Sequence, residues 1–126
     1  MSYPPDEMFY GFEACGLAVR GRIEGWSGAL VKQADLTSIS YKIFDLDNFN
    51  EITGSGALVV ADVIFDEEQE SAAWPYADGY NFLTVLPATC FPVGGHLYRS
   101  EFIFTPAAGE PYAVPVMIHA RDLLTY

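Results

Sequence analysis

The feature of this sequence that most constrains its fold is a repeated alternation of apolar and polar side chains. In residues 15–24, the apolar Leu17, Val19 and Ile23 alternate with charged side chains. A period of two places successive side chains on opposite faces of an extended strand, so that one face can be buried and the other solvated. The pattern predicts a half-buried strand. The same period recurs in residues 36–46, 96–104 and 112–120.

The strand-like runs are short and are separated by turn-forming residues. Gly25–Gly28 and Thr105–Pro111 are two of these breaks, and residues 80–86 form another β-rich run that ends at Pro87. Six or seven short strands with almost no helix are typical of an antiparallel β-sandwich or barrel, and not of alternating strands and helices. The sequence therefore predicts an all-β domain.

Three segments between the clearest strands are harder to assign. Residues 45–56 are rich in Asp, Asn and Gly and predict a loop. Residues 58–65 predict a further strand, and residues 66–74 predict a short helix of one or two turns before Pro75. Because proline has no N–H to donate, Pro115 predicts that the last strand lies at a sheet edge or is bulged there.

The first 14 residues read as an extended arm that precedes one sandwich domain, residues 15–126. Pro4-Pro5 favours an extended backbone. An apolar cluster follows these prolines: Met8, Phe9, Tyr10 and Phe12. Since apolar side chains are costly to leave in water, the arm should pack on a neighbouring molecule as an assembly arm, or fold back as an extra strand on its own sandwich. The sequence leaves both alternatives open.

The charge of the chain excludes several classes of partner. Its formal net charge is −11, and no Lys or Arg occurs between Ile43 and Tyr98. Such a field repels phosphate backbones and anionic lipid surfaces, so we expect neither nucleic-acid nor membrane binding. Only 18% of the residues are charged while 51% are hydrophobic, which predicts surplus apolar surface buried against other proteins or further copies of this chain.

Residues with catalytic or metal-binding chemistry are few, and we expect no enzymatic activity, no metal and no cofactor. His96 and His119 each fall on a predicted strand without metal-ligand spacing. Cys15 and Cys90 are too far apart in sequence for a zinc motif; a bridge between them is an alternative to the two free thiols that we favour. The carboxylates of residues 45–51 weakly resemble a calcium loop but lack its central glycine.

Aromatic residues give the only candidates for a binding surface. Trp26, Trp74, Tyr76 and Tyr80 could form a sugar-stacking platform, which makes a carbohydrate-binding module for host attachment the alternative function. Tryptophan in a small β domain belongs more often to the core or an interface. The residues that we predict to contact a partner protein are Met8, Phe9, Tyr10, Phe12, Trp26, Trp74 and Tyr76.

Two stretches carry a resemblance to a known family. The first is Phe91-Pro-Val-Gly-Gly-His-Leu-Tyr-Arg-Ser-Glu-Phe-Ile-Phe104, in which a glycine turn precedes a Y-x-x-E-F strand. It is similar to the closing half of Ig-like β-sandwich domains in tailed-phage virion proteins, such as the N-terminal domain of baseplate upper proteins. Leu36–Asp45 resembles an early strand of the same domains. The resemblance covers about residues 15–120 and implies an antiparallel Ig-like β-sandwich.

For function, the resemblance implies a structural role in the virion, with no catalytic or cofactor residue. The N-terminal sequence lacks the basic and apolar regions of a secretory signal, so we expect synthesis in the host cytoplasm and incorporation into the particle. The baseplate family continues into further domains where this chain ends at Tyr126. We therefore expect a capsid decoration, head–tail or tail/baseplate accessory protein that binds other virion proteins.

Overall fold

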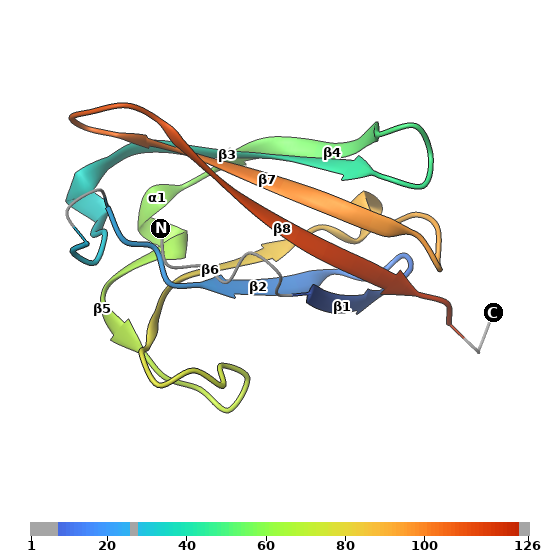
Figure 1. Ribbon diagram of the computed structural model, residues 1–126, viewed down its shortest axis with the longest axis horizontal. Helices are drawn as coiled ribbons and strands as arrows, with labels where there is room; N and C mark the ends of the chain where they lie inside the picture. Colours follow the sequence, from blue (N-terminus) through green and yellow to red (C-terminus); the bar gives the residue numbers. More distant parts are fainter. Residues whose placement is uncertain (1–7, 26–27, 124–126) are drawn as a thin grey trace.

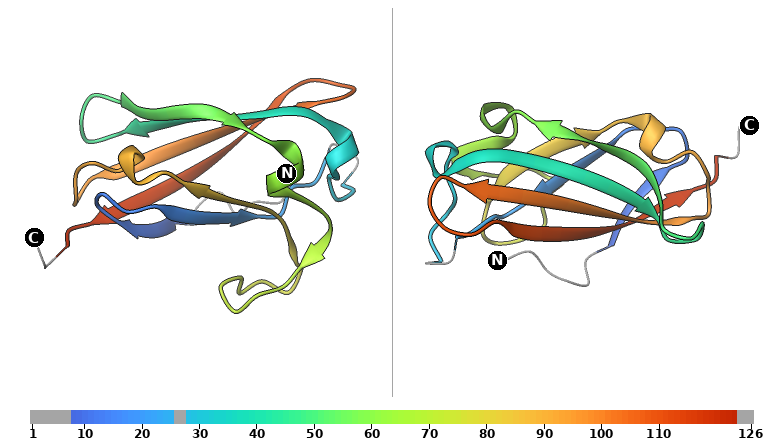
Figure 2. Two further views of the ribbon diagram at one scale, coloured as in Figure 1. Left: turned by 180° about the vertical axis from the view of Figure 1, so that it is seen from behind. Right: turned by 90° about the horizontal axis from the view of Figure 1, so that it is seen from above.

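The computed structural model describes residues 8–25 and 28–123, which form eight strands in two sheets packed face to face (Figures 1 and 2). One sheet has five strands in the order β1-β8-β7-β3-β4, and the other has three in the order β2-β6-β5. The strands are β1 (Met8–Phe12), β2 (Leu17–Gly21), β3 (Leu36–Asp45), β4 (Glu51–Leu58), β5 (Ile64–Gln69), β6 (Tyr80–Leu86), β7 (Leu97–Pro106) and β8 (Tyr112–Arg121).

The order and direction of the strands are those of an Ig-like sandwich. Strands β8, β7, β3 and β4 pair antiparallel in the order of the G, F, C and C′ strands, and β2, β6 and β5 match strands B, E and D. β1 adds to the five-stranded sheet beside β8, in parallel. The predicted all-β, Ig-like fold is confirmed, with eight strands in place of six or seven.

The core lies between the two sheets and is centred on the hairpin of β7 and β8. Phe102 and Phe104 are fully buried. Phe82 of the opposite sheet contacts both edge to face, with ring centroids 5.2 and 5.5 Å away. Of the residues that the alternation predicts to face inward on these two strands, Tyr112 is half-buried and the others are buried: Tyr98, Phe102, Phe104, Val114, Val116 and Ile118.

Tyr98 ties the start of β7 to the preceding corner. Its hydroxyl donates to the Val93 carbonyl and accepts from the Val93 N–H, each at 3.0 Å. This is the tyrosine corner found in Ig-like sandwiches. Ser100, two residues later, stands where immunoglobulin domains have the second cysteine of their inter-sheet disulfide. Both cysteines of this chain are free instead, and burial raises the pKa of the Cys90 thiol.

A buried amide fixes the segment between β2 and β3. Asn81 on β6 is inaccessible to solvent. Its side chain accepts the Ile23 N–H at 2.7 Å and donates to the carbonyls of Ile23 and Val31 at 3.1 and 2.8 Å. These bonds satisfy backbone groups of Ile23 and Val31, which lie outside the strands, and so tie the segment to β6.

The predicted loop at residues 45–56 is wrong in its second half, because β4 begins at Glu51. Glycine has a low strand propensity, but two glycines of β4 are needed because other side chains lie too close to leave room for a Cβ atom. A Cβ at Gly54 would collide with the Sγ of Cys90, and one at Gly56 would lie 3.2 Å from the Tyr41 ring. Tertiary packing therefore explains a strand that local sequence disfavours.

The segment after β4 also differs from its prediction. In place of one strand over residues 58–65, a single helical turn, α1 (Val60–Val63), follows β4. The predicted helix at residues 66–74 is wrong, because the chain forms β5 to Gln69 and then a loop. Pairing of Gln69 with Tyr80 and of Ile64 with Phe82 overrides the weak helical signal of the acidic residues. No helix among residues 8–25 and 28–123 is long and apolar enough to cross a bilayer.

The described part of the predicted arm is a strand of the sandwich. Met8–Phe12 pair with β8 from Met117 to Arg121, so this segment follows the second alternative, an extra strand on the same domain. Residues 1–7 lie outside the described residues. The prediction that the last strand is an edge strand or is bulged at Pro115 is wrong, because β8 lies between β1 and β7 and its pairing with β7 has no register shift at Pro115. Pro115 is accommodated because the described part of β1 begins only opposite Met117.

Candidate functional site

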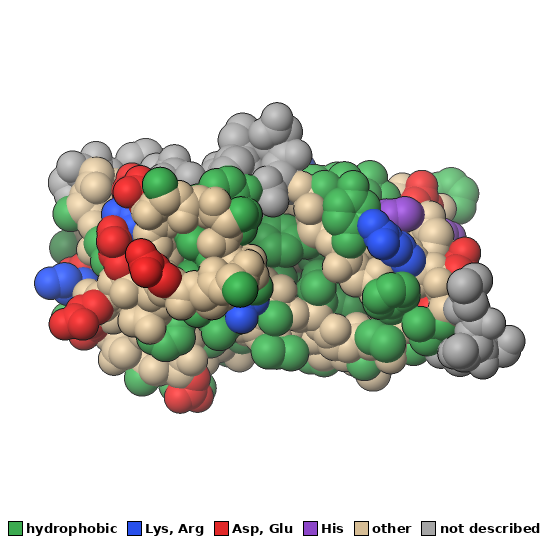
Figure 3. All heavy atoms as spheres, turned by 90° about the horizontal axis from the view of Figure 1, so that it is seen from below, with side chains coloured by type: hydrophobic (Ala, Val, Ile, Leu, Met, Phe, Trp, Pro, Cys, Tyr) green, Lys and Arg blue, Asp and Glu red, His purple; other side chains and the backbone are tan. Residues whose placement is uncertain are grey.

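The candidate site is a pocket of about 230 Å³ on the side of the sandwich where the edge strands of the two sheets, β1 and β2, lie close together. Hydrophobic side chains surround a hollow in the middle of the face seen from below (Figure 3). The pocket is lined by residues from β1, β2 and the loop after β5: Phe9, Tyr10, Leu17, Ala18, Arg20, Ala73, Trp74, Pro75 and Tyr76.

Each element supplies its side chains for a local reason. β1 turns Phe9 toward the core and leaves Tyr10 on the outer face, 55% exposed. Ala18 and Arg20 fall on the outer face of β2, as the alternation predicts, and the small Ala18 leaves room beside Arg20. The loop places Trp74 over the three-stranded sheet, where its indole N–H donates to the Asp78 carbonyl at 2.6 Å.

The Trp74 ring contacts Tyr76 of the same loop and Tyr80 of β6. The Trp74 ring meets the Tyr76 ring at 67° with centroids 4.8 Å apart, and meets the buried Tyr80 ring at 58° and 5.7 Å. Such contacts hold rings in place with a gain of about 0.5–1.5 kcal/mol each beyond burial. The three rings are not coplanar. Trp74 and Tyr76, which line the pocket, therefore form an angled wall and not a flat sugar-stacking platform.

Arg20 is the charged residue of the lining. Its guanidinium lies over the Tyr80 ring, 5.5 Å from the centroid. The Nε atom is buried and has no hydrogen-bond partner among the described residues. A buried guanidinium N–H without a partner costs free energy. As the one charged side chain in the described lining, Arg20 favours an occupant with a negative charge nearby over one with a positive charge.

The outer face of β1 and β8 extends the site beyond the pocket. Tyr10 pairs with His119 across the two strands, and their rings meet edge to face at 6.0 Å. The Arg121 guanidinium lies over the Tyr10 ring, 4.6 Å from the centroid. Phe12, which pairs with Arg121, is 46% exposed. An exposed strip of aromatic and cationic side chains thus borders the pocket.

Four of the seven residues predicted to contact a partner meet in this pocket: Phe9, Tyr10, Trp74 and Tyr76. Phe12 is on the same strand outside the lining, and Met8 is half-buried at the start of β1. Trp26 lies outside the described residues. Sequence reasoning missed Leu17, Ala18 and Arg20, whose only signal was their place on an alternating strand beside the aromatic segments.

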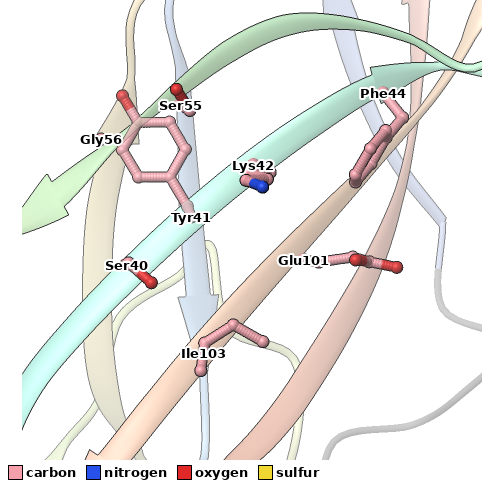
Figure 4. A pocket seen from close by; sticks show the side chains of 8 residues that line it. All are labelled: Ser40, Tyr41, Lys42, Phe44, Ser55, Gly56, Glu101 and Ile103. Atoms are coloured by element: carbon pink, nitrogen blue, oxygen red, sulfur yellow. The ribbon is translucent and has the colours of Figure 1, made fainter.

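A second hollow, of about 370 Å³, lies on the outer side of the five-stranded sheet (Figure 4). It is lined by Ser40, Tyr41, Lys42, Phe44, Ser55, Gly56, Glu101 and Ile103. Lys42 and Glu101 are directly opposite each other on β3 and β7, and Tyr41 extends toward Gly56 at the edge. The described residues of its lining include neither tryptophan nor arginine, two of the residue types most enriched at protein–protein hot spots, so the aromatic pocket is the stronger candidate for a protein-binding site.

The carboxylates that weakly resemble a calcium loop are used in internal hydrogen bonds. Asp45 is buried and contacts His96 Nδ1 at 2.8 Å, and this hydrogen bond raises the pKa of the imidazole. Asp47 accepts the Leu97 N–H at 2.7 Å, and Glu51 accepts from the Asn48 side chain at 3.0 Å. No group of three or more metal-ligating side chains occurs among the described residues.

Comparison with known proteins adds no relative: no protein-family model matches the chain, and no curated protein matches its sequence.

Proposed function

We propose that this protein is a non-enzymatic structural or accessory component of a phage virion, and that it acts by binding other virion proteins through the aromatic pocket. The observation that carries the proposal is the composition of the pocket. Trp74, Tyr76, Tyr10 and Arg20 are of the three residue types most enriched at protein–protein hot spots. The virion assignment rests on the sequence resemblance in residues 91–104 and 36–45.

The arrangement of the pocket supports a protein ligand. Its aromatic walls come from three segments and are held by ring contacts and the Trp74–Asp78 hydrogen bond, so little side-chain entropy is lost when a partner binds. The tilted rings suit a bulky apolar anchor better than the flat face of a sugar. The carbohydrate-binding alternative therefore becomes an outcome of the test.

The proposal is tested with virions assembled without this chain. Purified wild-type protein should co-sediment with such particles, and Trp74→Ala should not. Ile52→Ala is the matched control, because Ile52 is 51% exposed on β4, at the other edge of the five-stranded sheet; it should bind as the wild type does.

Failure of the wild-type protein to co-sediment would refute the virion role. Binding to a glycan array that Trp74→Ala abolishes, without binding to particles, would establish the carbohydrate alternative instead.

A further inference from the structure

The hairpin turn between β3 and β4 presents an exposed aromatic side chain in an unfavourable backbone conformation. Phe49 is 99% exposed. The φ angles of Phe49 and Asn50 are +55° and +57°, and the Glu51 N–H donates to the Asn48 carbonyl at 3.0 Å. Two central residues with positive φ define a type I′ turn, which favours Asn-Gly. A bulky residue is an outlier there, and such outliers gather at functional sites.

This turn is held firmly on the sandwich. The Asp45 carboxylate accepts the Asp47 N–H at 3.0 Å as well as contacting His96. Asp47 in turn accepts the N–H of Leu97 on β7. The base of the turn is therefore bonded to the neighbouring strand, and Phe49 projects from a fixed support. An aromatic anchor presented in this way binds at a low entropic cost.

The pocket and the turn are complementary in shape and charge. Phe49 is a single ring, and the pocket of about 230 Å³ is walled by rings that can meet it edge to face. The turn is flanked by the carboxylates of Asp47 and Glu51. The pocket side presents the cations Arg20 and Arg121, so the contact joins opposite charges.

The two features lie on different parts of one molecule. The β3–β4 connection projects from one end of the five-stranded layer, whereas the pocket lies beside β2 and the loop after β5 (Figure 1). One copy therefore cannot fill its own pocket with its own Phe49. We infer that the Phe49 side chain of one copy binds in the aromatic pocket of a second copy. The inference rests on the proposed function, protein binding by the pocket, and names the partner.

This contact is heterologous, since it joins two different surfaces. Repetition of a heterologous contact builds a ring if the rotation closes and a filament if it does not. The inferred assembly is therefore a head-to-tail oligomer, in which each copy donates Phe49 to one neighbour and receives Phe49 from the other.

The test is sedimentation velocity on the full chain over about 1 µM to 1 mM. The wild-type protein should form oligomers, and Phe49→Ala and Trp74→Ala should each weaken association at least about tenfold. The two variants should form a 1:1 dimer when mixed, because Phe49→Ala keeps an intact pocket and Trp74→Ala keeps an intact Phe49. Val59→Ala is the control, because Val59 is 63% exposed and follows the end of β4 that is opposite the turn; it should associate as the wild type does.

A monomeric wild-type protein over that range, unchanged association of Phe49→Ala, or no dimer in the mixture would each overturn the inference. Tyr76→Ala provides a second pocket variant in case Trp74→Ala disturbs the loop, and it should behave as Trp74→Ala does. If Trp74→Ala loses binding to virions while Phe49→Ala keeps it and the wild type is monomeric, the proposed function stands and only self-association is refuted.

Discussion

The aromatic side chains of this protein fall into two groups with different surroundings. In the core, Phe82, Phe102 and Phe104 are buried between the sheets, and the Phe82 ring contacts each of the other two edge to face. In the pocket, Tyr10 and Tyr76 are 55% and 37% exposed. The first group follows a period of two on paired strands, whereas the second comes from an edge strand and a loop. Ring contacts thus stabilise the fold in one place and shape a partly exposed surface in the other.

The largest expected effect tests this division directly. Phe102→Ala should lower the free energy of unfolding by about 3–5 kcal/mol, because it removes a fully buried ring and leaves a cavity. Tyr10→Ala should cost about 1 kcal/mol or less, because the ring is more than half exposed. Chemical denaturation of both variants measures the difference. Equal losses would show that the pocket rings belong to the folding core.

A smaller effect sharpens the description of the core side. Ser100 is fully buried, and its hydroxyl has no hydrogen-bond partner among the described residues. Ser100→Ala should raise the free energy of unfolding by about 1 kcal/mol, because it removes an unsatisfied polar group. Ser40→Ala is the matched control: Ser40 is exposed on β3, and its substitution should change stability by less than about 0.5 kcal/mol. Destabilisation by Ser100→Ala would show that the hydroxyl is bonded in solution.

The smallest expected effect concerns the hydrogen bond between His96 and Asp45 at the base of the turn that carries Phe49. The hydrogen bond to Asp45 raises the pKa of His96 above 6.5 in the folded chain. This pair therefore adds stability fully below the unfolded pKa of about 6.5, and the contribution is lost as the pH rises through the folded pKa. Melting temperatures of the wild type and His96→Gln should differ most below about pH 6.5 and converge as the pH rises through the folded pKa of His96. A difference that is constant with pH would contradict this ion pair.

Sequence reasoning found the parts of the fold that local patterns determine. β7 and β8 were predicted because one face of each is buried, which imposes the period of two on residues such as Phe102 and Val116. β4 was missed because contacts with other parts of the chain require its glycines. Gly54 lies against Cys90, which is distant in sequence, and Gly56 lies against Tyr41 on the neighbouring strand. Local strand propensity carries no information about residues that are distant in sequence and close only in the folded structure.

The same distinction applies to the candidate site. Phe9, Tyr10, Trp74 and Tyr76 were each identified as apolar residues in need of a contact. Their convergence depends on β1 pairing with β8 and on the loop folding over β2, and neither follows from a sequence pattern. Phe49 gave no signal, because a single aromatic residue in a polar segment differs from its neighbours only in composition, and its exposure is set by the turn conformation.

The parallel pairing of β1 with β8 has a consequence for the order of folding during synthesis. Met8 pairs with Met117, so the first described strand must wait for the last one to leave the ribosome, several seconds later at about 5–20 residues per second. Until then the β8 partner is absent and Phe9 has no sheet to pack on. The docking of β1 is therefore a late step with a large loop-closure cost, and it completes the wall of the pocket only when the remaining sandwich has formed.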